Sequence, residues 1–213
     1  MSHNQYFNKA ARTWDDNPAR HEMANALFQE LCRHVRLDRN TDVLDFGAGT
    51  GLVTLPVAQH AGSVTAMDSS DEMLTVLKHK ANAAGLDVRT QRYNGTEFPD
   101  PGGRFDVIVS TMVLHHIAEP AALLKQFAQW LRPGGHLVLA DLEPEDGSFH
   151  GDNPTVHHHG FDPQQLCRLI REQDMNIQAI SRPHCIRRPQ GNGTVREYPV
   201  FLLVAEKPVE HVH

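Results

Sequence analysis

Residues 43–51 read Val43-Leu44-Asp45-Phe46-Gly47-Ala48-Gly49-Thr50-Gly51, an apolar run that leads directly into a glycine-rich turn. Such an apolar run is typical of a buried strand, and glycine lets the following backbone turn tightly and approach a ligand closely. In open α/β sheets, ligands bind in the crevice beyond the carboxyl ends of the strands. The segment therefore predicts a strand, a ligand-binding turn and the start of a helix.

Strand-like runs and amphipathic helices alternate after this turn, as far as residue 142. A strand–helix–strand succession requires right-handed crossover connections and gives a parallel sheet that is covered on both faces. The pattern therefore predicts a doubly wound α/β fold, with a turn at Pro133-Gly134-Gly135 before the last of these strands. The predicted strands are 42–46, 63–67, 88–93, 105–110 and 136–142, and the predicted helices are 52–61, 69–85 and 121–131.

The two ends of the chain extend this pattern. Asn17-Pro18 is typical of a helix start, and apolar residues that recur every four positions predict a helix through Arg36. Asp162-Pro163 starts another predicted helix. The β-like runs near 177–187 and 198–206 predict an antiparallel hairpin at one edge of the sheet.

Composition bears on location and partners. Lysine and arginine number 20 against 26 aspartate and glutamate residues, a net charge of −6 with no basic tract, so we expect no nucleic-acid partner. The longest apolar run, 200–205, is far shorter than a membrane span, and the N-terminus has no apolar stretch of signal-peptide length. The 3 cysteines form no Cys-x-x-Cys pair, as is typical of a reducing compartment. We therefore expect a soluble, cytoplasmic protein with no membrane partner.

Asp68 lies seventeen residues after Gly51, at the end of the next predicted strand. A carboxylate at this position can accept hydrogen bonds from both hydroxyls of a ribose. The dinucleotide fingerprint has glycine at its sixth position, where this chain has Leu52, and no lysine follows to form a Walker loop. Asp45 also places negative charge where a pyrophosphate needs positive charge. These residues predict an adenosine with a cationic tail, and they disfavour a nicotinamide oxidoreductase.

The motifs between residues 41 and 142 resemble, in order and spacing, those of the class I S-adenosylmethionine-dependent methyltransferases. The run 45–51 resembles the first motif of that family, Asp68 its acidic second-strand end, and 105–117 and 131–141 its fourth- and fifth-strand motifs. The resemblance implies a Rossmann-like, mostly parallel seven-stranded sheet, with S-adenosylmethionine as the cofactor and S-adenosylhomocysteine as the product. The cofactor-binding residues that we expect are Tyr6, Trp14, Asp45, Gly47, Ala48, Gly49, Thr50, Gly51, Asp68, Ser69, Met73, Asn94, Gly95, Thr96 and Thr111.

Asn94 departs from the family pattern, which commonly has an acidic residue after the third strand. Its amide oxygen can still accept a hydrogen bond from the adenine amino group, and the N–H of Gly95 or Thr96 can serve a ring nitrogen. The alternative is that Asn94 only caps a turn.

Aromatic residues near the N-terminus resemble the Y-F-x-x-A-x-x-W segment of many small family members. This resemblance implies a lid in which Tyr6 and Trp14 cover the methionine end of the cofactor, the alternative being a helix that simply packs on the sheet. We expect a single domain over residues 1–213. It is divided into an N-terminal helical lid (1–36), a cofactor-binding core (41–142), and an acceptor-side loop, helix and closing hairpin (143–213).

Histidines supply the candidate base. His115 and His116 follow the fourth predicted strand at its ligand-facing end, and His116 is our candidate for removing a proton from the acceptor. The alternative is a structural histidine bonded to backbone.

A second histidine group, His157, His158 and His159, lies in a turn-rich stretch near His150 and Asp152. We expect it to pack in the loop or the acceptor pocket. A metal site and incidental surface histidines are the alternatives, and no acid or cysteine completes a metal-ligand set. Among charged residues farther along, Arg187, Arg188 and Arg196 either bind a carboxylate or phosphate on the acceptor or form a solvated hairpin tip.

The sequence thus predicts an enzyme that moves the methyl group of S-adenosylmethionine to a small-molecule acceptor by in-line displacement. We expect it to be a monomer or homodimer. The alternative is a non-catalytic subunit that binds the same cofactor and acts as a regulatory or partner protein. A quinone precursor, a carboxylic acid and a small amine all remain open as the acceptor.

Overall fold

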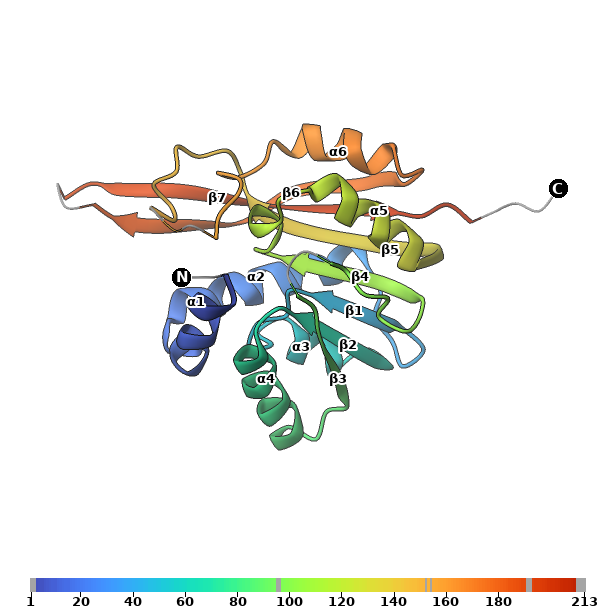
Figure 1. Ribbon diagram of the computed structural model, residues 1–213. Helices are drawn as coiled ribbons and strands as arrows, with labels where there is room; N and C mark the ends of the chain where they lie inside the picture. The colour runs from blue at the N-terminus through green and yellow to red at the C-terminus, as the bar shows by residue number, and fades with distance from the viewer. Residues whose placement is uncertain (1–2, 95–96, 152, 154, 191–192, 210–213) are drawn as a thin grey trace.

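Seven strands form one sheet in the order β3-β2-β1-β4-β5-β7-β6 (Figure 1). The computed structural model describes residues 3–94, 97–151, 153, 155–190 and 193–209. Pairings among the first five strands are parallel, whereas β7 pairs antiparallel with both β5 and β6. The predicted mostly parallel sheet with a C-terminal antiparallel hairpin is confirmed. The strands are β1 (Asp42–Phe46), β2 (Ser63–Asp68), β3 (Val88–Arg92), β4 (Phe105–Thr111), β5 (Leu131–Leu142), β6 (Asn176–Pro189) and β7 (Val195–Glu206).

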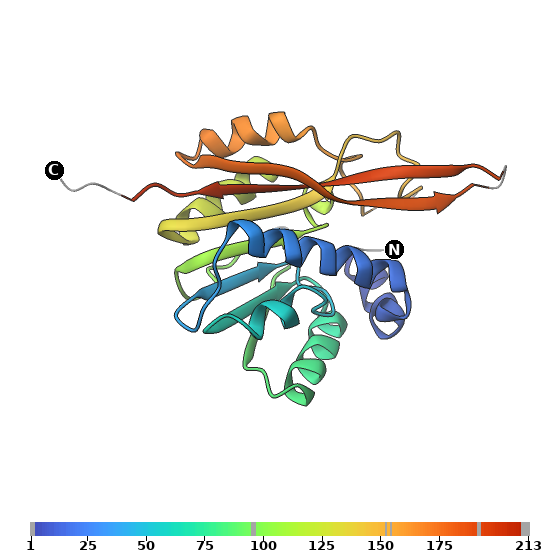
Figure 2. The ribbon, with the colours of Figure 1, turned by 180° about the vertical axis from the view of Figure 1, so that it is seen from behind.

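Helices cover both faces of the sheet, as Figures 1 and 2 show from opposite sides. The alternation of β1 explains this, because Val43 packs on the side of α2 and α3 while Leu44 and Phe46 pack on the side of α5 and α6. Both faces of β1 are therefore buried, as in a doubly wound sheet. The helices are α1 (His3–Ala10), α2 (Pro18–His34), α3 (Thr54–Ala58), α4 (Asp71–Ala83), α5 (Pro120–Trp130) and α6 (Pro163–Arg171), with 3-10 turns η1 (Ala11–Asp16) and η2 (Leu114–His116).

Side-chain caps fix three of the helix starts. The side chain of Asn17 accepts a hydrogen bond from the N–H of Ala19 at 3.0 Å, and Ser70 and Asp162 cap α4 and α6 in the same way. The predicted starts at Asn17 and Asp162 are confirmed. Helix α2 ends two residues earlier than predicted, because Val35 adopts an extended conformation.

The prediction that Pro133-Gly134-Gly135 separates a helix from a strand is wrong. Strand β5 begins directly after α5 and includes these three residues. Leu131 already pairs with Phe105, and the register shifts just beyond it. Gly134 has a φ of +79° and donates to the carbonyl of Lys207 at 2.7 Å. The three residues therefore form an irregularity inside β5, and the carbonyl of Lys207 accepts the hydrogen bond of the Gly134 N–H there.

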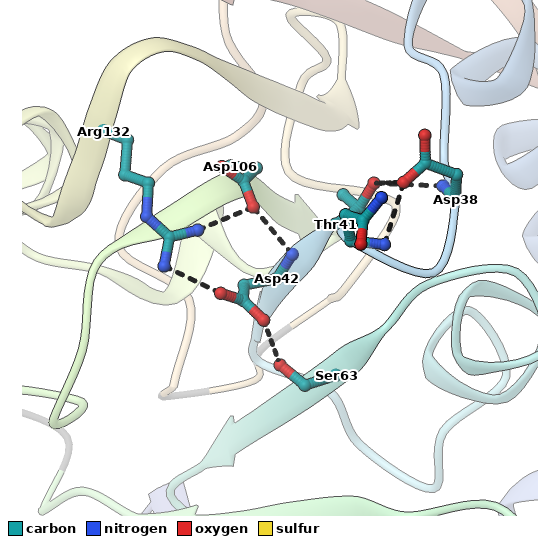
Figure 3. A network of polar contacts seen from close by, with 7 residues as sticks. Asp38, Thr41, Asp42, Ser63, Asp106 and Arg132 are labelled. Atoms are coloured by element: carbon teal, nitrogen blue, oxygen red, sulfur yellow. Dashed lines mark hydrogen bonds and ion pairs between the residues drawn. The ribbon is translucent and has the colours of Figure 1, made fainter.

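A polar network ties the strands together at the amino end of β1 (Figure 3). Arg132 binds Asp42 at 2.7 Å and Asp106 at 2.6 Å, and Ser63 donates to Asp42 at 2.6 Å. The hydrogen bond from Ser63 and the Arg132 guanidinium hold the pKa of Asp42 below its usual value. Beside them, Asp38 accepts from the Thr41 hydroxyl at 3.4 Å. The glycine turn lies at the opposite end of the sheet, where β1 ends at Phe46.

Within the described ranges, no helix has both the length and the apolar composition that a membrane crossing requires.

Candidate active site

A cavity of about 460 Å³ lies at the carboxyl end of the sheet. The N-terminal segment, the glycine turn, the loop after β5 and the end of β6 all contribute to its lining. Figure 1 shows α1 and the end of β6 at this same end of the sheet. Eleven of the predicted site residues line it: Tyr6, Trp14, Gly47, Ala48, Gly49, Thr50, Asp68, Ser69, Met73, Thr111 and His116.

The glycine turn is held against β2 by its own backbone. The N–H groups of Gly47 and Ala48 donate to the carbonyl of Met67 at 2.7 and 3.0 Å. Gly47 has a φ of +79°, and a Cβ there would lie 2.1 Å from a methyl of Val113. Gly49, in contrast, has no heavy atom within 4 Å of the place where a Cβ would stand. Gly47 is thus required by packing, whereas Gly49 leaves open space beside the cavity.

Asp68 joins the turn to β2 and still faces the cavity. One carboxylate oxygen accepts from the N–H of Gly49 and the other from the N–H of Ser70, both at 2.8 Å. The backbone N–H of Ser69 also donates to this carboxylate, which has about four lone-pair sites and therefore keeps one for a further donor. Burial raises the pKa of Asp68.

Asp45 and Gly51, by contrast, do not line the cavity. Asp45 is 2% exposed and accepts a hydrogen bond from the Thr54 hydroxyl at 2.6 Å. Burial raises the pKa of Asp45 to about 7, and the nearby charge of Asp68 adds to the effect. In this structure Asp45 fixes the start of α3 behind the turn.

Asn94 is exposed and away from the cavity lining. Its side-chain oxygen accepts from the N–H of Glu97 at 2.6 Å, which is the turn-capping alternative. Gly95 and Thr96 lie outside the described residues. Tyr93, which we did not predict, lines the cavity instead, and its ring stacks on Phe46 at a centroid distance of 4.7 Å.

The N-terminal segment is fastened over the glycine turn by Asp15. One oxygen of Asp15 accepts from the Thr50 hydroxyl at 2.6 Å, and the other accepts from the ammonium of Lys80 at 2.6 Å. Lys80 also donates to the backbone oxygen of Thr50 at 2.9 Å. Farther along, Ser70 donates to Asn8 at 2.6 Å. Neither Asp15 nor Lys80 was predicted, because their pairing joins distant parts of the chain.

Histidines form another part of the cavity lining. The Nδ1 of His116 lies 2.8 Å from the carbonyl oxygen of Thr155, so Nδ1 carries the hydrogen of this contact. The ring of Phe7 meets His116 edge-on at a centroid distance of 5.3 Å. His116 therefore lies in the cavity lining with its ring held between Thr155 and Phe7.

His115 is buried beside His116 and pairs with Asp141. Its Nδ1 lies 2.7 Å from the carboxylate of Asp141, and its carbonyl accepts from the N–H groups of His157 and His158. The ring of His150 lies 4.6 Å from that of His115, and burial lowers the pKa of His150 to about 4. His115 and Asp141 thus position the loop that follows β5.

The side chains of His157, His158 and His159 have separate surroundings. His157 and His159 are exposed, and His159 lies 3.4 Å from Glu145. The ring of His158 donates to the carbonyl of Ile117 at 2.9 Å. In the part of the chain that the structure describes, no group of three or more His, Cys, Asp or Glu side chains is arranged to hold a metal ion.

Curated relatives share sequence with this chain. A ubiquinone biosynthesis O-methyltransferase from Parvibaculum lavamentivorans is 31% identical over 166 residues, which cover 71% of this chain and 62% of that protein. A protein of the same name from Xanthomonas campestris pv. campestris is 28% identical over 190 residues, which cover 81% of this chain and 79% of that protein. The chain therefore spans less than two thirds of the Parvibaculum protein's length.

Solved structures share the fold. A SAM-dependent methyltransferase from Aquifex aeolicus superposes with a TM-score of 0.70 at 18% identity, covering 97% of this chain and 99% of that chain. Magnesium protoporphyrin IX methyltransferase from Synechocystis PCC 6803, solved with bound SAM, superposes with a TM-score of 0.65 at 16% identity, covering 88% and 79%.

A family model described as a methyltransferase domain matches residues 19–179. This range covers most of the chain, from α2 to the start of β6. The chain therefore belongs to the methyltransferase-domain family, which confirms its resemblance to the class I S-adenosylmethionine-dependent methyltransferases.

Proposed function

We propose that this protein transfers a methyl group from S-adenosylmethionine to a hydroxyl of a small-molecule acceptor. The observation that carries this proposal is that the glycine turn, Asp68 and His116 line one and the same cavity. The names of the two O-methyltransferase relatives support transfer to oxygen. When bound, S-adenosylmethionine would supply a methyl group activated on a sulfonium.

The residues around the glycine turn fit the adenosine part of this cofactor. Asp68 has a lone-pair site left for a ribose hydroxyl, and the open space beside Gly49 admits close approach of a ligand to the backbone. Met73 and Tyr93 supply apolar lining where the adenine would lie. In this proposal Asp45 acts indirectly, by holding the turn and α3 in place.

The N-terminal segment acts as a lid. Tyr6 and Trp14 both line the cavity, and Asp15 fastens their segment to the turn and to α4. A lid excludes water and holds the reacting groups in line, which is most of what an in-line displacement needs from a protein. We therefore assign Tyr6 and Trp14 to the closure of the cofactor site.

His116 is the proposed base. In this proposal Nε2 takes the proton, while Nδ1–H stays directed to the carbonyl of Thr155. Histidine is the side chain that most often serves as a general base in proton transfer. His115, in contrast, is a positioning residue, because its ring is buried against Asp141.

Calorimetry and turnover together test this proposal. We expect S-adenosylmethionine to bind the wild-type protein and to bind Asp68→Ala far more weakly. Asp71→Ala is the matched control, because Asp71 pairs with Arg92 outside the cavity. With labelled cofactor and a metabolite extract, the wild type should form S-adenosylhomocysteine. Binding without any turnover would instead indicate the non-catalytic subunit.

His116→Gln separates catalysis from binding. We expect turnover to fall by about 10²-fold or more while cofactor affinity stays unchanged. His157→Gln is the control, since His157 is exposed. Normal turnover of His116→Gln with the true acceptor would remove His116 from the mechanism.

Three further proposals concern the whole protein. We propose one methyltransferase domain with the three parts 1–36, 41–142 and 143–213, which gel filtration and limited proteolysis would test. We propose a monomer or homodimer. We also propose a cytoplasmic location, in keeping with the free state of all three cysteines, and cell fractionation would test it.

A further inference from the structure

Positive charge gathers at one part of the cavity wall. Arg20 on α2 and Arg188 on β6 both line the cavity. Among the lining residues that the structure describes, Asp68 is the sole acidic one, and it stands beside the glycine turn. The chain as a whole carries a net charge of −6, so this local excess of positive charge runs against the overall balance.

Arg20 is held in place by the lid. Its guanidinium lies 3.7 Å from the centre of the Trp14 ring and donates to the Trp14 carbonyl at 2.7 Å. Burial lowers the pKa of Arg20, and repulsion from Arg188 lowers it further. The two guanidinium groups therefore act on each other across the same space.

Arg188 is held in place by the loop after β5. Its guanidinium lies 3.8 Å from the centre of the Phe149 ring and donates to the Phe149 carbonyl. A guanidinium has five N–H donors, and this contact uses a single one. Among the described residues, no acceptor engages the remaining donors of Arg188 or Arg20, so these donors are available to a ligand.

Neither arginine forms an ion pair with a described carboxylate, in contrast to its neighbours on the hairpin. The neighbouring arginines are paired as Arg182 with Glu143, Arg187 with Glu197 and Arg196 with Asp146. Asp15 lies near Arg20, but its two oxygens are engaged by Thr50 and Lys80. Two oriented like charges that share a cavity and lack a protein counter-ion are the usual arrangement for binding an anion.

We propose that Arg20 and Arg188 together bind an oxyanion group, a carboxylate or a phosphate, on the methyl acceptor. This inference rests on the proposed function, because it names the acceptor class of the same cavity. Phe7, Met23 and Ile186 line the cavity as well and provide an apolar surface for the rest of the acceptor. The acceptor is therefore an amphipathic anion, with the methylated hydroxyl on its apolar body.

Calorimetry of three probes in the presence of S-adenosylhomocysteine tests this inference. The probes are para-hydroxybenzoate, phenyl phosphate and the neutral para-hydroxybenzyl alcohol. We expect one of the anions to bind at least about tenfold more tightly than the alcohol. A preference for the benzoate identifies a carboxylate on the acceptor, and a preference for phenyl phosphate identifies a phosphate.

Charge-removing variants assign the preference to the two arginines. Arg188→Gln and Arg20→Gln should each abolish most of it, while the affinity for the alcohol stays unchanged. Arg182→Gln is the control, because it removes the same charge from β6 outside the cavity. If Arg20→Gln disturbs the lid, Arg188→Gln alone decides, since the guanidinium of Arg188 lies over the rings of Phe149 and Tyr198.

Equal affinities for anion and alcohol, or no binding of any probe at about 10 mM, would overturn the inference. So would a preference that survives in Arg188→Gln. The affinity for S-adenosylhomocysteine is measured separately in each sample. Cofactor binding without an anion preference removes only this inference, whereas an anion preference without cofactor binding removes the proposed function.

Discussion

Replacement of Asp15 by alanine should open the lid. Asp15 connects the N-terminal segment to both Thr50 and Lys80 through contacts of 2.6 Å each. The side chains of Asp15 and Lys80 are each 28% exposed, so the pair is only partly screened by water. The variant removes both contacts and leaves the cavity lining itself unchanged, since Asp15 is not part of it.

The size of the effect follows from these contacts. A hydrogen bond to a charged group contributes about 1.5–3 kcal/mol when buried, whereas an exposed ion pair contributes about 0.2–1 kcal/mol. Because the pair is partly exposed, we expect the free energy that favours the closed lid to fall by about 1.5 kcal/mol. Apparent affinity scales with the fraction of molecules that are competent to bind, so the Kd for S-adenosylmethionine should rise by up to about tenfold.

Titration calorimetry with S-adenosylmethionine measures this change directly. Asp16→Ala is the control, because Asp16 is exposed and adjacent in sequence. Thermal unfolding of both variants shows whether the fold is intact. An unchanged Kd in Asp15→Ala, or an equal loss in Asp16→Ala, would refute the assignment of Asp15 as the fastening of the lid.

Three other predictions concern stability. Gly47→Ala should lower the free energy of unfolding in urea by about 2–4 kcal/mol, because its Cβ would lie 2.1 Å from a methyl of Val113; Gly49→Ala, which meets no atom within 4 Å, should cost only about 1 kcal/mol. Burial lowers the pKa of folded His150 to about 4 from 6.5, so the stability that its neutral ring supports is present above pH 6.5 and lost as the pH falls toward 4. Between pH 6.5 and 4, the free energy of unfolding should therefore fall by about 1–2 kcal/mol less in His150→Gln than in the wild type, after allowance for solvent screening. Identical dependence of the unfolding free energy on pH in the two proteins would contradict this. Arg132→Met removes two ion pairs with carboxylates and should cost about 1 kcal/mol at low salt, with a smaller difference in high salt.

The part of the cavity formed by the glycine turn and Asp68 was predictable from the sequence because its elements are local. The run 45–51 is one strand–turn–helix unit, and Asp68 ends the strand that pairs with β1. Within such a unit, the glycine spacing and the carboxylate at the strand end are enough to predict a ligand-binding turn. The same locality explains why the helix starts at Asn17 and Asp162 were predicted correctly.

The rest of the site depends on contacts between distant segments. The pairing of Asp15 with Lys80 spans 65 residues, and that of His115 with Asp141 spans 26. No periodicity predicts which polar side chains meet when the N-terminal segment packs on α4. The sequence also does not single out Tyr93, which lines the cavity while the adjacent Asn94 is exposed, because adjacent residues at a strand end point to opposite sides.

A structure determined with S-adenosylhomocysteine tests the central claim most directly. We predict electron density for the adenosyl group in the cavity, with a ribose hydroxyl within hydrogen-bonding distance of Asp68 and the sulfur toward His116. Density elsewhere on the molecule, or a nucleoside whose sugar does not touch Asp68, would contradict it.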